Sequence, residues 1–218
     1  MTNIIAFQRI ALAMAVLLLA ACASQPDKLE VAPEEWKFKD RAIYLEFRAP
    51  ADLNAYNGRP HALAVGIYQL SDPNTFSGLG ATHEGAVELL RKGKIDDTIV
   101  HFTRITVQPG ERKSIVLNRA ETARYVGMIS GYFRLTPTHD VGLFPIPVKA
   151  SKRGLVENSL AAIKLIADEA KANPDDLYLN INLGRDSTKQ MMVAKPLGRS
   201  GIKEKKRKKP EEPVDKAP

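Results

Sequence analysis

The amino-acid sequence predicts a mainly β protein whose strands form two packed antiparallel sheets, a β-sandwich, with one or two short helices added. Several segments alternate apolar and polar residues with period two, which is typical of strands that bury one face. These segments follow one another at spacings too short for helical crossovers, which disfavours a parallel sheet. The 218 residues, 44% hydrophobic and 26% charged, suit one globular domain, which we expect over residues 36–196.

The N-terminus carries the features of an export signal. Arg9 precedes an uncharged apolar run over residues 10–21, which at about 1.5 Å per residue reaches roughly 18 Å, less than a bilayer core of about 30 Å. We therefore predict a signal peptide over residues 1–21 rather than a transmembrane helix. The run ends in LAAC at residues 19–22, which resembles a bacterial lipobox, so we expect the Cys22 thiol to receive diacylglycerol. The alternative is an ordinary signal peptide with a chance cysteine at its end.

The expected lipid determines where the chain acts. Lipoproteins of this type carry several acyl chains, which hold them permanently at a membrane. The residue after Cys22 is Ala23 rather than aspartate, which in sorted lipoproteins of enteric-type bacteria implies the outer membrane, with the domain facing the periplasm. Residues 22–35 are mostly polar, contain two prolines and are predicted to be a tether. An exported protein has no access to DNA, so we expect no nucleic-acid partner.

The first two predicted strands are separated by a long loop. Residues 42–48 and 61–70 both alternate, and the residues expected on their buried faces are Ile43, Leu45, Phe47, Leu63, Val65 and Ile67. In the second strand the opposite face holds Ala64, Gly66 and Tyr68. Residues 49–61 between them contain two prolines and the turn signal Asn57-Gly58. This loop is longer than a hairpin needs, and long loops are commonly functional or disordered.

A short helix is expected after the second strand. Residues 71–80 are turn-rich around Phe76. The following segment has apolar residues at helical spacing, namely Ala86, Leu89 and Leu90. Gly93 is expected to end this helix, since glycine is the usual residue just past a helix C-terminus.

Two further strands follow the predicted helix. Residues 98–107 form the third strand, but its apolar phase slips between Phe102 and Ile105. We therefore expect a β-bulge near Thr103-Arg104, because one extra residue would restore the phase. A turn at Pro109-Gly110 then leads into a fourth strand over residues 113–118.

The last third of the folded part mixes strands with a second helix. Residues 125–135 are apolar on both faces, as expected of a strand in the centre of a sheet. Three prolines within residues 136–148 permit only short, edge-like strands. Residues 155–172 have a helical apolar stripe that ends at Asn173-Pro174. The most regular alternation lies at residues 177–183, and residues 189–194 are expected to return as its hairpin partner.

The basic character of the chain is concentrated at its C-terminus. The formal net charge is +7, and residues 203–209 alone contribute six positive charges and one negative charge. Residues 197–218 have almost nothing to bury and are predicted to be disordered. Two interpretations remain open, a solvated flexible terminus or electrostatic contact with anionic lipid or cell-wall polymer. The residues that would make this contact are Lys203, Lys205, Lys206, Arg207, Lys208 and Lys209.

The sequence nominates no catalytic constellation. It contains no nucleophile elbow, no Gly-rich phosphate loop and no metal-ligand spacing among its four histidines and single cysteine. His101 is interpreted as a core or edge histidine, and Asp96-Asp97 and His139-Asp140 as solvated turns. We therefore expect no enzyme activity, no metal and no cofactor, and a binding role is favoured by elimination.

The order of several motifs resembles a known family of secretion proteins. The pieces are the lipobox, LEFRAPADLNAYNGRPHALAVGIYQL, the helix end ELLRKG, VQPGERKSIVL and ARYVGMISGYFRL. Together, from residue 19 to about 135, they resemble TssJ (SciN/VasD), the outer-membrane lipoprotein of the type VI secretion system. This resemblance implies a transthyretin-like β-sandwich and a structural role rather than catalysis. The helix at 155–172 and the basic tail are additions relative to that pattern.

The resemblance also implies a partner and a contact site. In the family, the lipoprotein binds the periplasmic part of the inner-membrane protein TssM, mainly through the loop between the first two strands. Carried over to this chain, the contact residues are Leu53, Asn54, Ala55, Tyr56, Asn57, Gly58 and Arg59. Tyr56 and Arg59 are residue types common in interface anchors, although Tyr56 could instead cap the end of the sandwich. The alternative function is a periplasmic ligand- or cell-wall-binding lipoprotein that uses its basic tail.

Overall fold

A computed structural model of the chain describes residues 31–150 and 172–195. The chain divides into two compact units. The smaller unit comprises Met1–Trp36 with Pro147–Asp175, and the larger comprises Lys37–Ile146 with Asp176–Pro218. The predicted signal peptide, most of the tether and the basic tail lie outside the described residues. No helix among the described residues is both long and apolar enough to cross a membrane.

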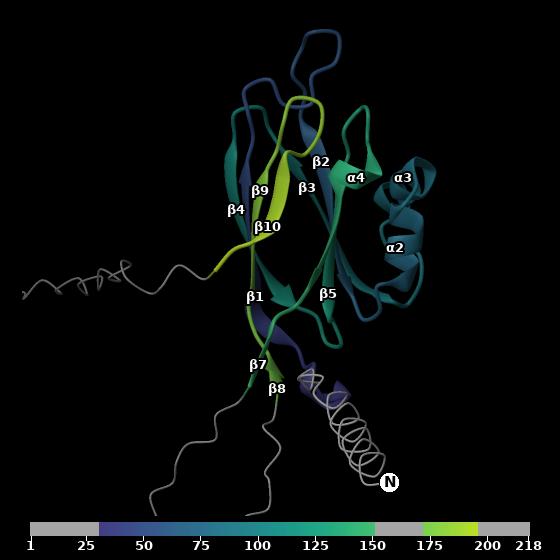
Figure 1. The fold of residues 1–218 in the computed structure, drawn as a ribbon, viewed down its shortest axis with the longest axis vertical. Coiled ribbons are helices and arrows are strands. Elements are labelled where there is room, and N and C mark those ends of the chain that lie inside the picture. The colour runs from purple at the N-terminus through teal and green to yellow at the C-terminus, as the bar shows by residue number, and fades with distance from the viewer. Residues whose placement is uncertain (1–30, 151–171, 196–218) are drawn as a thin grey trace, which may run out of the picture. The chain divides into compact units, whose positions relative to one another are not determined.

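The larger unit contains two four-stranded sheets, which confirms the mainly β fold class (Figure 1). The first has the order β10-β9-β1-β4, and the second has the order β3-β2-β5-β6. The strands of the first sheet are β10 (Gln190–Val193), β9 (Leu177–Asn182), β1 (Lys39–Arg48) and β4 (Arg112–Arg119). Those of the second sheet are β3 (Ile99–Val107), β2 (Leu63–Leu70), β5 (Tyr125–Ser130) and β6 (Val141–Pro145).

One strand pair departs from the expected antiparallel arrangement. β1 and β9 are parallel, with Tyr44 opposite Tyr178, whereas the other pairs in these two sheets are antiparallel. The short spacings in the sequence exclude helical crossovers only between strands that are consecutive in the chain. β1 and β9 are separated by the whole second sheet, so the chain has ample length to return in the same direction.

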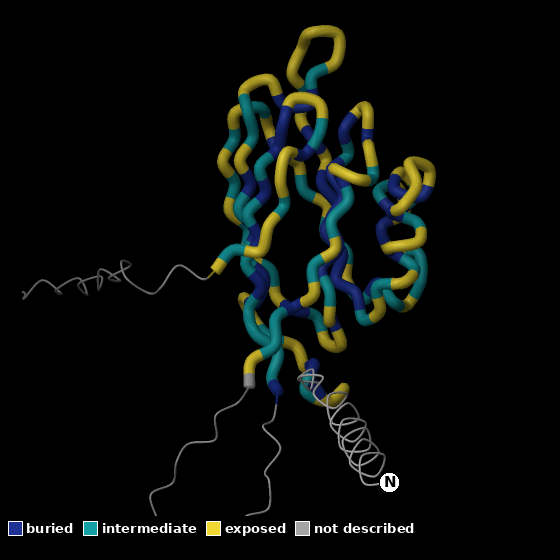
Figure 2. The backbone as a smooth tube through the Cα atoms, in the orientation of Figure 1, coloured by how far each residue is buried: buried dark blue, intermediate teal, exposed yellow. Residues whose placement is uncertain are grey.

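The core is built from the alternating faces that the sequence predicts. Ile43, Leu45 and Phe47 of β1 are buried, and so are Leu177, Leu179 and Ile181 of β9. In Figure 2 buried positions run along the strands of both sheets, while exposed positions gather in the loops and on outer faces. The strands predicted at 177–183 and 189–194 are confirmed as the β9–β10 hairpin.

Two helices cover the outer face of the second sheet. These are α2 (Asn74–Gly80) and α3 (His83–Lys92), which lie against this sheet on the side away from β4 and β9 (Figure 1). α3 and its end at Gly93 confirm the predicted helix, while α2 replaces the predicted turn around Phe76. Because α2 and α3 cover this face, Tyr68 is fully buried against Phe76 rather than exposed. The alternation of β2 misleads here, since both of its faces are buried.

The predicted β-bulge near Thr103-Arg104 is wrong. β2 and β3 pair in continuous register from Leu63–Val107 to Gln69–His101, and the irregularity lies at the other end, where Leu70 pairs with Ile99. Phe102 points to the helix-covered face, where its ring lies 4.9 Å from that of Tyr68. The apparent slip in the apolar phase of β3 therefore arises because this strand has apolar residues on both of its faces, and no extra residue is inserted. His101 is exposed on the edge strand β3, as interpreted from the sequence.

The strand β5 (Tyr125–Ser130) is shorter than the strand predicted over residues 125–135. β5 ends at Ser130 rather than continuing to residue 135, although it does lie inside its sheet between β2 and β6. A four-residue helix, α4 (Pro137–Asp140), then precedes β6. The proline-rich stretch, predicted to permit only short, edge-like strands, contains β6, which is five residues long and lies at the edge of its sheet.

The smaller unit contains little regular structure among its described residues. β7 (Val148–Ala150) and β8 (Ala172–Pro174) pair antiparallel, and the Asp175 amide donates to the carbonyl of Pro147 at 2.7 Å. A 3-10 turn, η2 (Pro33–Glu35), lies within the predicted tether. Residues 155–171 of the predicted helix lie outside the described residues, and its expected last residue, Ala172, belongs to strand β8 instead.

Candidate functional site

The loop that the resemblance marks as a contact lies at one end of the larger unit. It joins β1 to β2 and lies at the same end as the β9–β10 loop and the segment between β5 and α4 (Figure 1). Three segments that are far apart in the sequence therefore meet there. We call this set of residues, 49–62, 131–136 and 183–189, the loop end.

The first part of the predicted contact loop is buried. Leu53 is fully buried, and Asn54 is only 5% exposed. The Asn54 side chain accepts a hydrogen bond from the Phe133 amide at 3.1 Å and donates one to the carbonyl of Ala62 at 3.2 Å. Its backbone has a φ of 47°, a left-handed conformation that asparagine tolerates better than most residues. Leu53 and Asn54 therefore hold the loop in place rather than present a contact.

The second part of the loop is an exposed two-residue hairpin. Tyr56 and Arg59 exchange backbone hydrogen bonds of 2.9 and 3.0 Å. The two residues between them, Asn57 and Gly58, have φ values of 49° and 73°, as a type I′ turn requires. This agrees with the turn signal at Asn57-Gly58. Ala55 lies between the two parts, and its amide donates to the Arg185 carbonyl at 2.9 Å, which ties this loop to the β9–β10 loop.

An aromatic contact links this hairpin to the segment after β5. The Tyr56 ring stacks on the Phe133 ring with centroids 4.8 Å apart and an interplanar angle of 28°. His61 meets the same Phe133 ring edge-on at 5.1 Å. Tyr56 remains 50% exposed and Phe133 54% exposed, so the stacked pair presents apolar surface to solvent. Tyr56 therefore does not simply cap the core.

A groove of about 390 Å³ lies beside the hairpin. Its lining joins residues of the predicted loop to four residues that the sequence prediction did not include, namely Phe133, Arg134, Arg185 and Asp186. Phe133 and Arg134 fall within the segment predicted as continuous strand, and the other two fall within the β9–β10 turn. The available signal was Arg134, a charge inside an otherwise apolar run.

Two buried polar side chains hold the segments of the loop end together. Asp140 is fully buried and accepts hydrogen bonds from the amides of Thr136 and Thr188, each at 2.8 Å. The hydroxyl of Tyr132 donates to the Gly184 carbonyl at 3.2 Å and accepts from the Gly184 amide at 3.0 Å. The interpretation of His139-Asp140 as a solvated turn is therefore wrong for Asp140, whose carboxylate serves as an internal acceptor.

Burial also shifts the ionisation of both groups. Desolvation disfavours the charged form, so it raises the pKa of the Asp140 carboxyl above its ordinary value, even though the backbone donors oppose this shift. Burial likewise raises the pKa of the Tyr132 phenol to about 12, so this hydroxyl stays protonated and can donate to Gly184.

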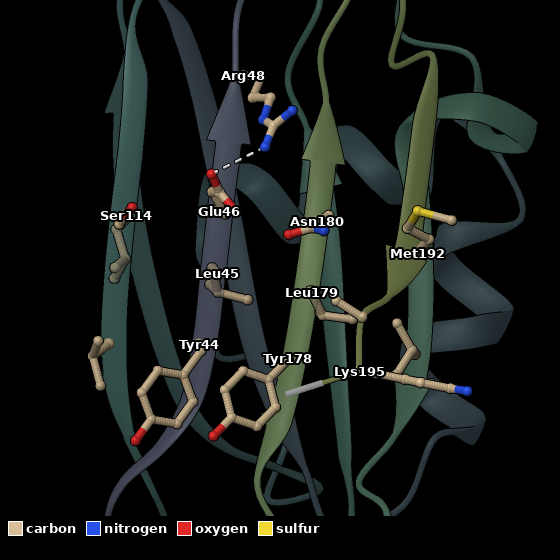
Figure 3. Close-up of a pocket in the computed structure, with 14 residues that line it drawn as sticks. Tyr44, Leu45, Glu46, Arg48, Ser114, Tyr178, Leu179, Asn180, Met192 and Lys195 are labelled. Atoms are coloured by element: carbon tan, nitrogen blue, oxygen red, sulfur yellow. Dashed lines mark hydrogen bonds and ion pairs between the residues drawn. The ribbon is translucent and has the colours of Figure 1, made fainter. Parts of the chain in front are cut away.

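A second hollow lies on the outer face of the first sheet (Figure 3). This groove, of about 650 Å³, is lined by residues of all four strands of that sheet. Tyr44 and Tyr178, on neighbouring strands, stack with centroids 4.5 Å apart and nearly parallel planes. Arg48 contacts Glu46 across 3.3 Å at the more polar end. The alternation that buries Ile43, Leu45 and Phe47 leaves Tyr44, Glu46 and Arg48 on this outward face.

The groups interpreted from the sequence as non-catalytic have structural partners. Asp96 accepts hydrogen bonds from the Thr98 hydroxyl at 2.6 Å and the Thr98 amide at 2.9 Å, which lowers the pKa of its carboxyl. The His101 ring lies 3.2 Å from the Thr103 hydroxyl. Within the described residues, no three His, Cys, Asp or Glu side chains are grouped so as to hold a metal ion.

Comparison with known proteins gives a family match. Residues 41–175 match the family T6SS-SciN, described as type VI secretion lipoprotein, VasD, EvfM, TssJ. This span contains the whole β1–β2 loop and extends beyond residue 135, so it also covers residues 155–172, which are predicted above to be an addition to the family pattern. A comparison with curated proteins gives no match.

Two solved structures resemble this chain. The T6SS lipoprotein TssJ1 from Pseudomonas aeruginosa has 16% identity and a TM-score of 0.50, over 73% of this chain and 97% of that one. The Serratia marcescens protein Lip, a membrane-bound component of the type VI secretion system, has 20% identity and a TM-score of 0.48, over 71% of this chain and 98% of that one. At 16% identity the likeness to TssJ1 concerns the fold alone.

Proposed function

Because this chain belongs to the type VI secretion lipoprotein family, we propose that it is a lipid-anchored structural subunit of the secretion apparatus. In this role it tethers the membrane complex to the outer membrane by binding the periplasmic domain of a TssM-like inner-membrane protein. The family is one of secretion lipoproteins rather than of enzymes. The observation that carries the proposal is the exposed Tyr56–Arg59 hairpin, held on a buried base in the loop that the resemblance marks as the contact.

The division of the loop supports this proposal. A binding loop must present side chains to a partner, yet must be ordered beforehand so that little entropy is lost on binding. Leu53 and Asn54 supply the order, since both are buried within the larger unit. Tyr56 and Arg59 supply exposed side chains of the types enriched at interfaces. The contact role therefore falls to Ala55, Tyr56, Asn57, Gly58 and Arg59, with Leu53 and Asn54 beneath them.

The anchor belongs to the same proposal, although Cys22 lies outside the described residues. The acylated Cys22 holds the chain in the outer membrane, and residues 23–30 lead from it to the first described residue, Val31. The folded units then face the periplasm, where an inner-membrane partner can reach the loop end.

A set of N-terminal variants tests the anchor in cells. With Cys22→Ser we expect the protein to leave the membrane fraction and secretion to stop, because an unanchored subunit cannot tether the complex. Ala23→Asp keeps the lipid but should move the protein to the inner membrane, and Ser24→Ala is the matched control that should change neither. Membrane fractionation and an effector-secretion assay measure these outcomes. Normal secretion by Cys22→Ser would overturn the anchoring role.

A binding measurement tests the contact. The full chain in detergent should bind the periplasmic domain of the TssM-like protein from the same secretion system. Tyr56→Ala and Arg59→Ala should each weaken that binding without lowering the melting temperature, because both side chains are exposed. Unchanged affinity in both variants would remove the hairpin from the interface.

A second candidate function is favoured by the groove on the outer face of the first sheet. Its volume of about 650 Å³ and its Tyr44–Tyr178 pair suit a small ligand or a cell-wall segment. The basic tail, outside the described residues, would add electrostatic attachment to anionic polymer. Truncation after Leu197 distinguishes the two functions. Loss of cell-wall pull-down with secretion intact would favour attachment to the cell wall through the basic tail, whereas a full chain that does not pull down cell wall at all would favour the secretion subunit.

A further inference from the structure

The contact surface at the loop end is larger than the hairpin. Phe133, from the segment after β5, is 54% exposed and stacks on Tyr56. These two aromatic rings come from segments about 77 residues apart in sequence, yet they form one exposed apolar spot. A partner that covers Tyr56 therefore also meets Phe133.

The three segments of the loop end are joined by hydrogen bonds and present one surface. The Ala55 amide donates to the Arg185 carbonyl at 2.9 Å, and the Phe133 amide donates to the Asn54 side chain at 3.1 Å. Beneath them, Tyr132 bonds Gly184 through both its donor and its acceptor. Such a surface is ordered before a partner arrives, which lowers the entropy cost of binding.

The charge around the aromatic pair is mainly positive. The charged residues that line the groove or form the hairpin are Arg59, Arg134, Arg185 and Asp186, and all four are exposed. Asp186 lies 3.9 Å from the Arg185 guanidinium, at exposed positions where such a pair binds weakly. The guanidinium groups of the three arginines are thus available to carboxylates of a partner. A guanidinium binds a carboxylate through paired, charge-assisted hydrogen bonds.

We propose that Phe133, Arg134 and Arg185 are contact residues in addition to the hairpin, and that the loop end binds an acidic segment carrying an apolar side chain. The apolar side chain packs on the Tyr56–Phe133 pair, and the carboxylates beside it meet the arginines. This inference rests on the proposed function, since the segment belongs to the periplasmic domain of the TssM-like partner. It adds the chemistry of that segment and three residues outside the β1–β2 loop.

The test measures binding of that periplasmic domain to the full chain in detergent. Phe133→Ala should weaken binding about tenfold or more, as expected for a central aromatic contact. The matched control is Phe38→Ala, because Phe38 is 60% exposed but precedes β1, at the opposite end of that strand from the loop. The control should bind like the wild type, and both variants should keep the wild-type melting temperature.

Charge variants test the chemistry of the partner segment. Arg185→Glu should weaken binding more than Arg185→Gln, and the same order should hold at Arg134, because reversal adds repulsion between like charges. Binding by the wild type should weaken as salt is raised, and this dependence should be smaller in Arg185→Gln. Arg124→Glu is the matched control, an exposed arginine immediately before β5, at the end of that strand away from the loop end.

The outcomes separate this inference from the proposed function. If Tyr56→Ala weakens binding while the Phe133, Arg134 and Arg185 variants bind like the wild type, the inference is overturned and the proposed function stands. If glutamate and glutamine at position 185 weaken binding equally, the acidic character of the segment is wrong. If the wild type does not bind the domain at all, the proposed function itself fails.

Discussion

The two halves of the β1–β2 loop are adjacent in sequence but have opposite roles in the fold. Leu53 and Asn54 are buried and bonded to other segments, whereas Tyr56 to Arg59 form an exposed hairpin. We call the first pair the loop base and residues 56–59 the loop tip. The resemblance marks the whole loop as a contact, but in the structure only its tip presents a contact surface, and its base is structural. Substitutions in the loop base should therefore lower stability, whereas substitutions in the loop tip should weaken binding.

The largest effect should come from removing the loop base. Leu53→Ala deletes a fully buried side chain and leaves a cavity, so we expect the free energy of unfolding to fall by about 3 kcal/mol. Leu143→Ala is the matched control, because Leu143 is 37% exposed and its truncation should cost about 1 kcal/mol or less. Urea denaturation measures both. Equal losses would show that the base contributes no more than a surface residue.

The next largest effect should come from the Asn54 side chain. Asn54→Ala leaves the Phe133 amide and the Ala62 carbonyl without this partner, so we expect a loss of about 2 kcal/mol. Asn57→Ala is a close control, since Asn57 has nearly the same left-handed φ, 49° against 47°, but lies exposed in the tip. Its cost therefore reports the backbone conformation alone. A loss at Asn54 no greater than that at Asn57 would remove the distinction between base and tip.

A smaller effect is expected at the tip. Gly58 has a φ of 73°, and no atom of any residue other than its two chain neighbours lies within 4 Å of the position that a Cβ would take. Gly58→Ala should therefore cost about 1 kcal/mol through backbone strain without any clash. Gly78→Ala, in α2 and equally open, should instead stabilise the chain slightly, because alanine is the better helix former. Thermal denaturation distinguishes the two signs, and a stabilised Gly58→Ala would contradict the type I′ turn.

The most gradual effect should be the pH dependence of the base. Burial raises the pKa of Asp140 in the folded state above its value in the unfolded chain, so on acidification the folded state binds the proton first. Compared with Asp140→Asn, the wild type should therefore gain stability as pH falls through the raised pKa toward about 3.8, its ordinary value, and lose it as pH rises. The slope cannot exceed about 1.4 kcal/mol per pH unit, the value for one proton. Urea denaturation of both proteins between pH 7 and 4 measures it, and a wild type that loses stability relative to Asp140→Asn on acidification would contradict the raised pKa.

The outer faces of the two sheets show where sequence patterns succeed and fail. The alternation in β1 and β9 identified their buried faces correctly, because only one face of these strands lies against the core. The same alternation places Tyr68 of β2 on the face opposite the predicted core face, yet α2 and α3 bury it. Periodicity reports how many sides of a strand are apolar, and it cannot show whether a glycine or tyrosine on the other side lies beneath a helix.

In the candidate site, too, sequence patterns predicted some features and not others. The local turn signal Asn57-Gly58 correctly marked the hairpin, because a type I′ turn needs positive φ at two consecutive residues. The roles of Leu53 and Asn54 could not be predicted from the loop itself, since the groups that bury and bond them come from other segments. Phe133 and Arg185 were missed because they belong to a predicted strand and a turn with no local sign of function.

What the sequence determined by itself was local: the strand faces, the helix end at Gly93, the hairpin turn and the residues that resemble a secretion lipoprotein. Tertiary structure alone decided that β1 and β9 run parallel, that Asp140 is buried, and that Tyr56, Phe133 and Arg185 meet at one end. The reason is physical. Backbone conformation and alternation depend on neighbours along the chain, whereas burial and contact depend on which distant segments the packed sheets bring together.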